Sequence, residues 1–253
     1  MDYLLFNSLN SFLTAAIIIM LGQIIYAAIG FGSAMISITM LSIIFGNISQ
    51  IIPYFLLLCV PTEIIIVSRN RHFLDFKFLK NFLLYLFSGL LIGSLLLKFT
   101  MPQKLLIYLG LVIIVIAFYF LLFENKMNPS FKKNGMAGKT LSFLSGILGG
   151  VYGISGPPII IFLKGLKMDK SRFRTTILSV FFAMSIIRTF IYTLLGLYNT
   201  KIILSVIATL PFVAAGIYIG NKIHLIISET RFKKITAILL LINGTILVLK
   251  HLK

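Results

Sequence analysis

The sequence predicts an all-α integral membrane protein, and three observations support this fold class. Hydrophobic residues make up 59% of the 253 residues, only 11% are charged, and the mean hydropathy is +1.05, which is more apolar surface than one soluble core can bury. The apolar runs are roughly 18 to 25 residues long, as a helix needs to cross hydrocarbon, whereas barrel strands would alternate over about ten residues. The net charge of +17 does not indicate nucleic-acid binding, because the basic residues lie in short loops between the apolar runs.

Apolar segments follow one another along the whole chain, with short polar connections. They lie at 10–29, 33–45, 50–68, 79–97, 104–123, 140–153, 157–163, 175–196, 202–220 and 233–250. The longest hydrophilic stretch, residues 124–139, contains Pro129 and Gly135, as is typical of a linker. We therefore expect a first membrane repeat at 1–123, a cytoplasmic linker at 124–139 and a second membrane repeat at 140–253.

The two halves resemble each other in the order of their glycine and polar residues. A shift of 124 residues aligns Gly22 with Gly146, Gly32 with Gly156, Asp75 with Asn199 and Lys77 with Lys201. A shift of 127 aligns the glycine pair at 89 and 93 with the pair at 216 and 220. One such match could arise by chance, but the ordered set predicts an internal duplication. Both glycine pairs are predicted to be helix contact faces.

The second half contains an apolar stretch that no helix can cross unbroken. Residues 146–163 carry five glycines followed by Pro157 and Pro158, which predicts an opening of at least one turn around residues 153–156. Irregular backbone at membrane depth is tolerated only beside protein or a water-filled cavity, so this break is predicted to line a cavity. Ser155 and Gly156 precede a half-helix that begins with proline, an arrangement that favours an anion.

The first half has a counterpart of this break at residues 22–41. Gly30, Phe31, Gly32 and Ser33 stand where the second half has Ile154, Ser155, Gly156 and Pro157. Glycine breaks a helix more weakly than proline, by roughly 1 kcal/mol per residue. We expect the two breaks together to form a substrate-binding site, although small residues such as Ser33, Ser37, Thr39 and Ser155 also serve as packing contacts between helices.

Two charged residues lie well inside apolar spans. Glu63 and Arg188 would each cost about 2.5 to 3.5 kcal/mol at a helix centre, so each needs a partner or water. One interpretation makes Arg188 the charge partner of a bound anion and Glu63 a coupling or gating group that carries a proton. The alternatives are a structural ion pair between the two, or an Arg188 whose side chain extends toward the membrane interface.

The positions of the basic residues predict the membrane topology. Most of the 23 Lys and Arg residues lie in four segments, at 69–80, 126–139, 164–174 and 222–234, and the positive-inside rule places these in the cytoplasm. Each broken pair, 10–45 and 140–163, must then enter and leave on one face, as a hairpin or as two crossings, and is followed by three full spans. The arm at 157–163 is too short to cross, which favours a re-entrant hairpin in the second half. An odd number of spans inverts the second repeat and leaves both termini outside a bacterial cell membrane, as in alternating-access carriers.

Several of these segments resemble one transporter family. The glycine-rich stretches GFGSAMISITML and GGVYGISGPPIIIFL and the charged segment R-x-R-H-F-x-D-F at 69–76 resemble the sulfite exporter TauE/SafE family of bacterial membrane transporters. The resemblance covers nearly the whole chain. It implies export of sulfite or a small organosulfonate, driven by an ion or proton gradient. Such carriers can also be homodimers.

No motif of catalysis or cofactor binding is found in the sequence. There is no HExxH, GxSxG or phosphate-loop sequence, and His72, His224 and His251 lie in loops or at ends, so we expect neither an enzyme nor a metal or other cofactor. The function hypothesis is a secondary carrier of a small anion. An anion channel, a membrane-embedded enzyme and a purely structural membrane protein remain alternatives.

Overall fold

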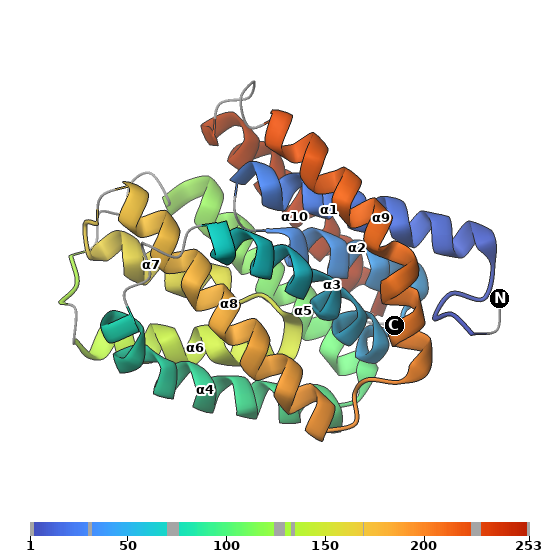
Figure 1. The fold of residues 1–253 in the computed structure, drawn as a ribbon, viewed down its shortest axis with the longest axis horizontal. Coiled ribbons are helices and arrows are strands. Elements are labelled where there is room, and N and C mark those ends of the chain that lie inside the picture. Colours follow the sequence, from blue (N-terminus) through green and yellow to red (C-terminus); the bar gives the residue numbers. More distant parts are fainter. Residues whose placement is uncertain are drawn as a thin grey trace. The chain divides into compact units, whose positions relative to one another are not determined.

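The computed structural model describes residues 3–29, 32–69, 76–123, 130–132, 135–168, 170–223 and 229–251, and these ranges are almost entirely helical (Figure 1). The helices are α1 (Leu9–Ile29), α2 (Ser33–Phe45), α3 (Ile48–Arg69), α4 (Phe76–Phe99), α5 (Pro102–Phe118), α6 (Met136–Tyr152), α7 (Gly156–Gly165), α8 (Lys170–Leu194), α9 (Thr200–Ile223) and α10 (Glu229–His251), with a π-helical turn, η2 (Tyr119–Phe123), after α5. Each predicted apolar segment corresponds to one helix. The all-α fold class is therefore confirmed.

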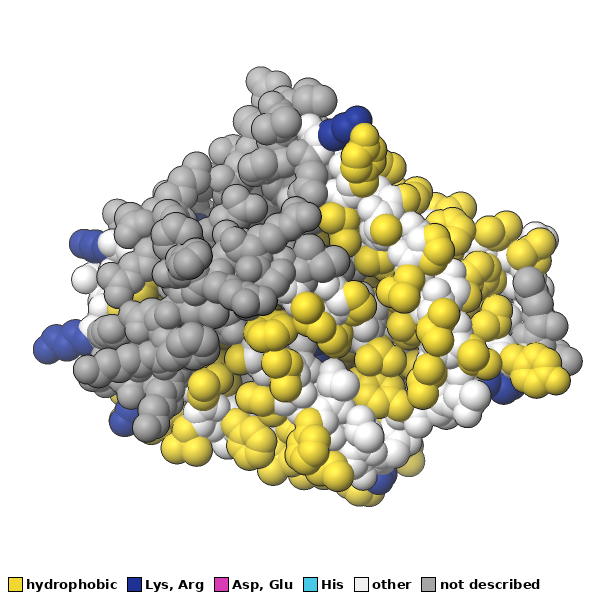
Figure 2. All heavy atoms as spheres, in the orientation of Figure 1, with side chains coloured by type: hydrophobic (Ala, Val, Ile, Leu, Met, Phe, Trp, Pro, Cys, Tyr) yellow, Lys and Arg dark blue, Asp and Glu magenta, His cyan; other side chains and the backbone are white. Residues whose placement is uncertain are grey.

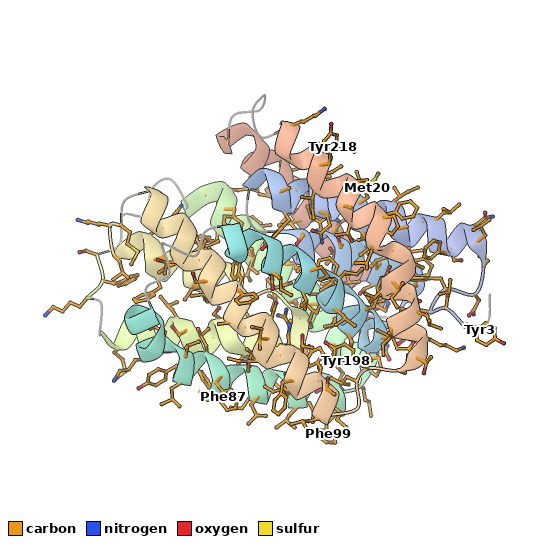
Figure 3. The ribbon with its side chains drawn as sticks, in the orientation of Figure 1. Tyr3, Met20, Phe87, Phe99, Tyr198 and Tyr218 are labelled. Carbon is orange, nitrogen blue, oxygen red and sulfur yellow. The ribbon has the colours of Figure 1, made fainter. Side chains whose placement is uncertain are left out.

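Four of the described helical stretches have the length and composition of membrane spans. Four stretches, Leu9–Ala27, Phe82–Phe99, Pro102–Leu122 and Thr200–Gly220, are long and apolar enough to cross a bilayer. On the face seen in Figure 2, hydrophobic side chains gather along α4 and α9. Phe87, Phe99 and Tyr218 are among the exposed hydrophobic residues (Figure 3). The Nζ atoms of Lys98 and Lys222 lie 5.5 and 4.5 Å from the ring centroids of Phe99 and Tyr218, the pairing of ring and ammonium expected near a membrane interface.

The chain folds into two compact units, each of which combines helices from both halves of the sequence. Unit 1 comprises residues 1–58, 100–126 and 196–253, and unit 2 comprises residues 59–99 and 127–195. Helix α3 contributes its first part to unit 1 and its last part, including Glu63, to unit 2. The division into repeats at 1–123 and 140–253, with their inversion, concerns order along the chain and stays a prediction.

Glycines bring α4 and α6 into close contact within unit 2, where the two helices lie side by side (Figure 1). A Cβ atom on Gly146 would meet the carbonyl oxygen of Leu86 and lie 3.0 Å from the Cα of Gly89. One turn further along, a Cβ on Gly93 would meet the backbone of Gly150 at 3.0 Å. Only hydrogen fits at these positions, so the predicted contact face at residues 89 and 93 is confirmed.

Unit 1 contains a similar glycine-mediated contact, between α1 and α9. A Cβ on Gly216 would lie 2.6 Å from the carbonyl oxygen of Met20, and a Cβ on Gly220 would lie 2.5 Å from that of Ile24. The predicted contact face at residues 216 and 220 is therefore confirmed as well. In both units the first arm of a broken hairpin packs against a glycine-bearing helix from the other half of the sequence.

The second arms of both broken hairpins are short. Helix α2 has 13 residues and α7 has 10, so they are about 20 and 15 Å long at 1.5 Å per residue. Neither reaches across about 30 Å of hydrocarbon. These lengths support the predicted re-entrant hairpin of the second half, whose orientation in the membrane stays a prediction.

Candidate functional site

The predicted break between residues 153 and 156 is present in unit 2. Helix α6 ends at Tyr152, and Gly153 adopts a left-handed conformation (φ 69°, ψ 11°) while its N–H still donates to the carbonyl of Gly149. Helix α7 begins at Gly156, with proline at its first positions, where the fixed φ of proline suits a helix start. Three residues, 153–155, are therefore non-helical, and all lie among apolar segments.

Ser155 occupies the N-cap position of α7, as the sequence predicts. Its dihedral angles (φ −82°, ψ −16°) lie in the right-handed helical region, and its hydroxyl makes no capping hydrogen bond. Its carbonyl oxygen instead accepts a hydrogen bond of 2.5 Å from the Ser145 hydroxyl on α6. Because Pro157 and Pro158 carry no N–H, the helix start offers fewer donors to an anion than the sequence analysis assumed. A positive charge must come from elsewhere.

Arg188 brings that charge to the break. It lies on α8, is only 4% exposed, and its Nη1 donates to the carbonyl oxygen of Gly149 at 3.4 Å. Gly149 is next to Ser155, since a Cβ at residue 149 would lie 3.1 Å from the Cβ of Ser155. The absence of a side chain at Gly149 therefore allows the break and the guanidinium group to approach each other.

Glu63 completes a charged cluster in unit 2. The residue is 7% exposed, and its carboxyl group is hydrogen-bonded to the Ser185 side chain and interacts electrostatically with Arg188. The Nη2 of Arg188 donates to the Ser185 hydroxyl at 3.1 Å, so this hydroxyl lies between the two charged groups. The remaining oxygen, Oε2 of Glu63, is buried without a hydrogen-bond partner. Glu63 and Arg188 therefore interact, which agrees with both interpretations of the sequence, a charge partner and coupling group or a structural ion pair.

The first-half break lies in unit 1 and carries no charge among its described residues. Gly32 is left-handed (φ 98°, ψ −13°) and precedes α2, whose first residue, Ser33, is buried. Gly30 and Phe31, which the sequence analysis also assigned to the substrate site, lie outside the described residues. A Cβ on Gly22 would meet the Ser37 hydroxyl, which indicates a packing role for both residues.

Sequence reasoning missed several residues that the structure places at these sites. Ser185 precedes Arg188 by one helical turn, a spacing that predicts contact and could have been noticed. Gly149 and Ser145 gave no such signal, because their partners come from other parts of the chain. In unit 1, Gln23 is fully buried and neither its Nε2 nor its Oε1 has a hydrogen-bond partner; an amide in a transmembrane segment is itself a signal.

A family model, Sulfite exporter TauE/SafE, matches residues 15–247. The chain belongs to this family. No curated protein and no solved structure gives a significant match.

Membership of the TauE/SafE family identifies the chain as a multi-pass membrane transporter for anions of the sulfite or sulfonate type. Members of the family are transporters rather than enzymes. The cluster in unit 2 has the chemistry that such a substrate requires. A guanidinium binds oxyanions with directed N–H groups, and its burial strengthens the attraction relative to water.

Proposed function

We propose that the protein is a secondary carrier that exports sulfite or a small organosulfonate by alternating access, using an ion or proton gradient. One observation carries this proposal: the buried Arg188 lies beside the break between α6 and α7. The substrate-binding residues proposed in unit 2 are Ser155, Gly156, Pro157 and Arg188. The corresponding residues proposed in the first half are Gly30, Phe31, Gly32 and Ser33.

Arg188 is proposed to supply the positive charge that attracts and orients the anion. Ser155 and Gly156 contribute polar groups at the break between α6 and α7. Pro157 has no backbone N–H to compete for the anion, and it prevents α6 and α7 from joining into one helix. Broken helices of this kind form substrate sites in many secondary transporters. The cell membrane, the external termini, the inverted repeats and a homodimer are further parts of the proposal.

Flux of labelled sulfite, small sulfonates and carboxylates into proteoliposomes tests the function. Saturable flux of sulfite or a sulfonate, lost in Arg188→Ala and reduced in Ser155→Ala, is the expected result. Removing a charged hydrogen-bond donor typically costs about 1.5 to 3 kcal/mol, equivalent to roughly a 10- to 150-fold loss of affinity. Flux that rises linearly with anion concentration would support a channel instead.

Two matched variants control for indirect damage. Lys98→Ala removes an exposed cation at the end of α4, and Ser88→Ala removes a hydroxyl that bonds the carbonyl of Tyr85 within the same helix. Both are expected to transport as the wild type does. Unaltered transport in Arg188→Ala and Ser155→Ala, with both proteins folded, would overturn the proposed site.

A further inference from the structure

The charged cluster of unit 2 is balanced before any substrate binds. Arg188 contributes one positive charge and Glu63 one negative charge, and both side chains are less than a tenth exposed. The Ser185 hydroxyl accepts a hydrogen bond from Arg188 and is bonded to the carboxyl group of Glu63. With Glu63 ionised, the cluster is therefore a neutral unit in which the carboxylate is the counterion to the guanidinium.

Binding of a monovalent anion would disturb this balance. The site would then hold two negative charges and one positive charge in a region of low dielectric constant, where an uncompensated charge costs several kcal/mol. Two changes relieve the imbalance: the anion stays out, or the carboxylate takes up a proton. The proton would bind to the Oε2 atom of Glu63, which is buried without a hydrogen-bond partner.

We infer that Glu63 binds one proton for each monovalent anion that binds at Arg188, so that anion and proton cross the membrane together. The inference rests on the proposed function and deepens it by naming the coupling ion and its stoichiometry. The proton comes from the solution on the side where the anion enters, forms an O–H bond at Glu63, and leaves with the anion on the other side. Ser185 is a positioning residue that holds the two charged groups in register.

The groups that act on Glu63 support an exchange in which Arg188 pairs either with the Glu63 carboxylate or with the anion. Arg188 and Ser185, both on α8, are the residues with an electrostatic or hydrogen-bonding effect on its carboxyl group in the described structure. The titratable side chains on the described parts of α4, α6 and α7, the other helices of unit 2, are Tyr85, Lys98, Lys139, Tyr152 and Lys164, and none of them is among the groups acting on Glu63. Protonation of Glu63 therefore releases Arg188 to the anion.

Coupled movement of one anion and one proton has two measurable consequences. The cycle transfers no net charge, so a membrane potential alone does not drive it, whereas a pH gradient does. By linkage, the apparent affinity for the anion rises as the pH falls, approaching about tenfold per pH unit over the range in which Glu63 titrates. An inward proton gradient then drives uptake, whereas export, in which the proton leaves with the anion, is driven by an outward anion gradient or an outward proton gradient.

The wild-type protein provides the first test. Labelled methanesulfonate is used because it keeps a single negative charge throughout, and sulfite, which itself titrates, is measured in parallel. Proteoliposomes are given either a pH gradient without a potential, or a potassium diffusion potential without a pH gradient. We expect the anion to accumulate in response to the pH gradient and not in response to the membrane potential alone. Accumulation driven by the potential alone, for the anion that shows saturable flux, would overturn the inference.

The variants separate coupling from binding. Glu63→Gln keeps the shape of the side chain but cannot ionise, so we expect anion counterflow close to the wild-type rate, no dependence on pH, and loss of accumulation by about tenfold or more. Glu63→Asp restores coupling, and Ser185→Ala keeps coupling with a shifted pH profile. If Glu63→Gln still accumulates anion in response to a pH gradient, the inference is wrong.

Failure of the inference is distinguishable from failure of the proposed function. Saturable flux that requires Arg188 but ignores pH in both wild type and Glu63→Gln would leave the carrier in place and refute proton coupling. Absence of flux for every anion in folded wild-type protein would refute both. Loss of counterflow in Glu63→Gln, with folded protein, would make Glu63 part of the binding site and also refute the assigned role.

Discussion

The two broken hairpins, α1–α2 in unit 1 and α6–α7 in unit 2, open in the same way but differ in charge. Each first arm ends before a left-handed glycine, Gly32 or Gly153, and each second arm is too short to span the membrane. The α6–α7 break lies beside Arg188 and in the same unit as Glu63, whereas the buried polar residues of the α1–α2 hairpin are neutral: Gln23, Ser33, Ser37, Thr39 and Ser42.

This difference shows that two hairpins with similar backbone features can carry unlike chemistry. Under the shift of 124 residues, Glu63 corresponds to Ile187 and Arg188 to Ile64, so neither charge has a charged counterpart in the other half. Backbone features such as glycine breaks and helix contacts recur in both units, because each hairpin needs them to fold. The charges occur once, as expected if they serve a single substrate rather than the fold.

Leucine substitutions at Glu63 in unit 2 and at Gln23 in unit 1 should give the largest difference in stability between the two units. Glu63→Leu leaves Arg188 buried without its counterion, and breaking a buried pair in this way costs about 3 to 5 kcal/mol. Gln23→Leu removes an amide that has no partner, which is expected to be neutral or stabilising by about 1 kcal/mol. The apparent Tm of the detergent-purified variants measures both effects.

A marked loss of stability in Gln23→Leu would show that the α1–α2 hairpin also depends on a buried polar interaction. That result would remove the proposed asymmetry between the two hairpins. Transport by Gln23→Leu at the wild-type rate would confirm that this amide takes no part in anion binding.

Alanine at the glycine contacts should have an intermediate and similar effect in both units. A Cβ at Gly146 meets the backbone of α4, and one at Gly216 meets the backbone of α1, so each variant should lose about 1 to 3 kcal/mol through overpacking. Gly196→Ala is the reference, because φ is +68° and no atom lies within 4 Å of the added Cβ; strain alone costs about 1 to 2 kcal/mol there. Tolerance of Gly216→Ala alone would show that the two contacts are not equivalent.

The smallest expected difference in stability is between variants of the two serines whose hydroxyls form hydrogen bonds within each hairpin. Ser145 donates to the carbonyl of Ser155 at 2.5 Å, whereas Ser37 donates to that of Ile18 at 3.4 Å. Ser145→Ala should therefore lose about 1 kcal/mol of stability and Ser37→Ala clearly less. Equal shifts in apparent Tm would mean that the hydroxyl of Ser37 contributes as much to its hairpin as that of Ser145.

The fold and part of the site could be predicted from sequence for local reasons. Hydrophobic runs of spanning length, glycines and the proline pair act on the backbone where they stand, so helix extents and both breaks were predicted correctly. The hydrogen bonding of Ser155 could not be predicted in this way: its hydroxyl makes no capping hydrogen bond to α7. The carbonyl of this residue is bonded by Ser145, ten residues earlier.

By itself, the sequence determined that this chain is helical and membrane-embedded, where its helices break, and to which family it belongs. Those properties depend on hydropathy and backbone preference over short stretches. Only the tertiary structure decided that Arg188 lies against Gly149, that Ser185 joins it to Glu63, and that each hairpin packs on a helix from the other half. Such contacts join residues far apart in the chain, and they depend on how close glycine allows two helices to approach.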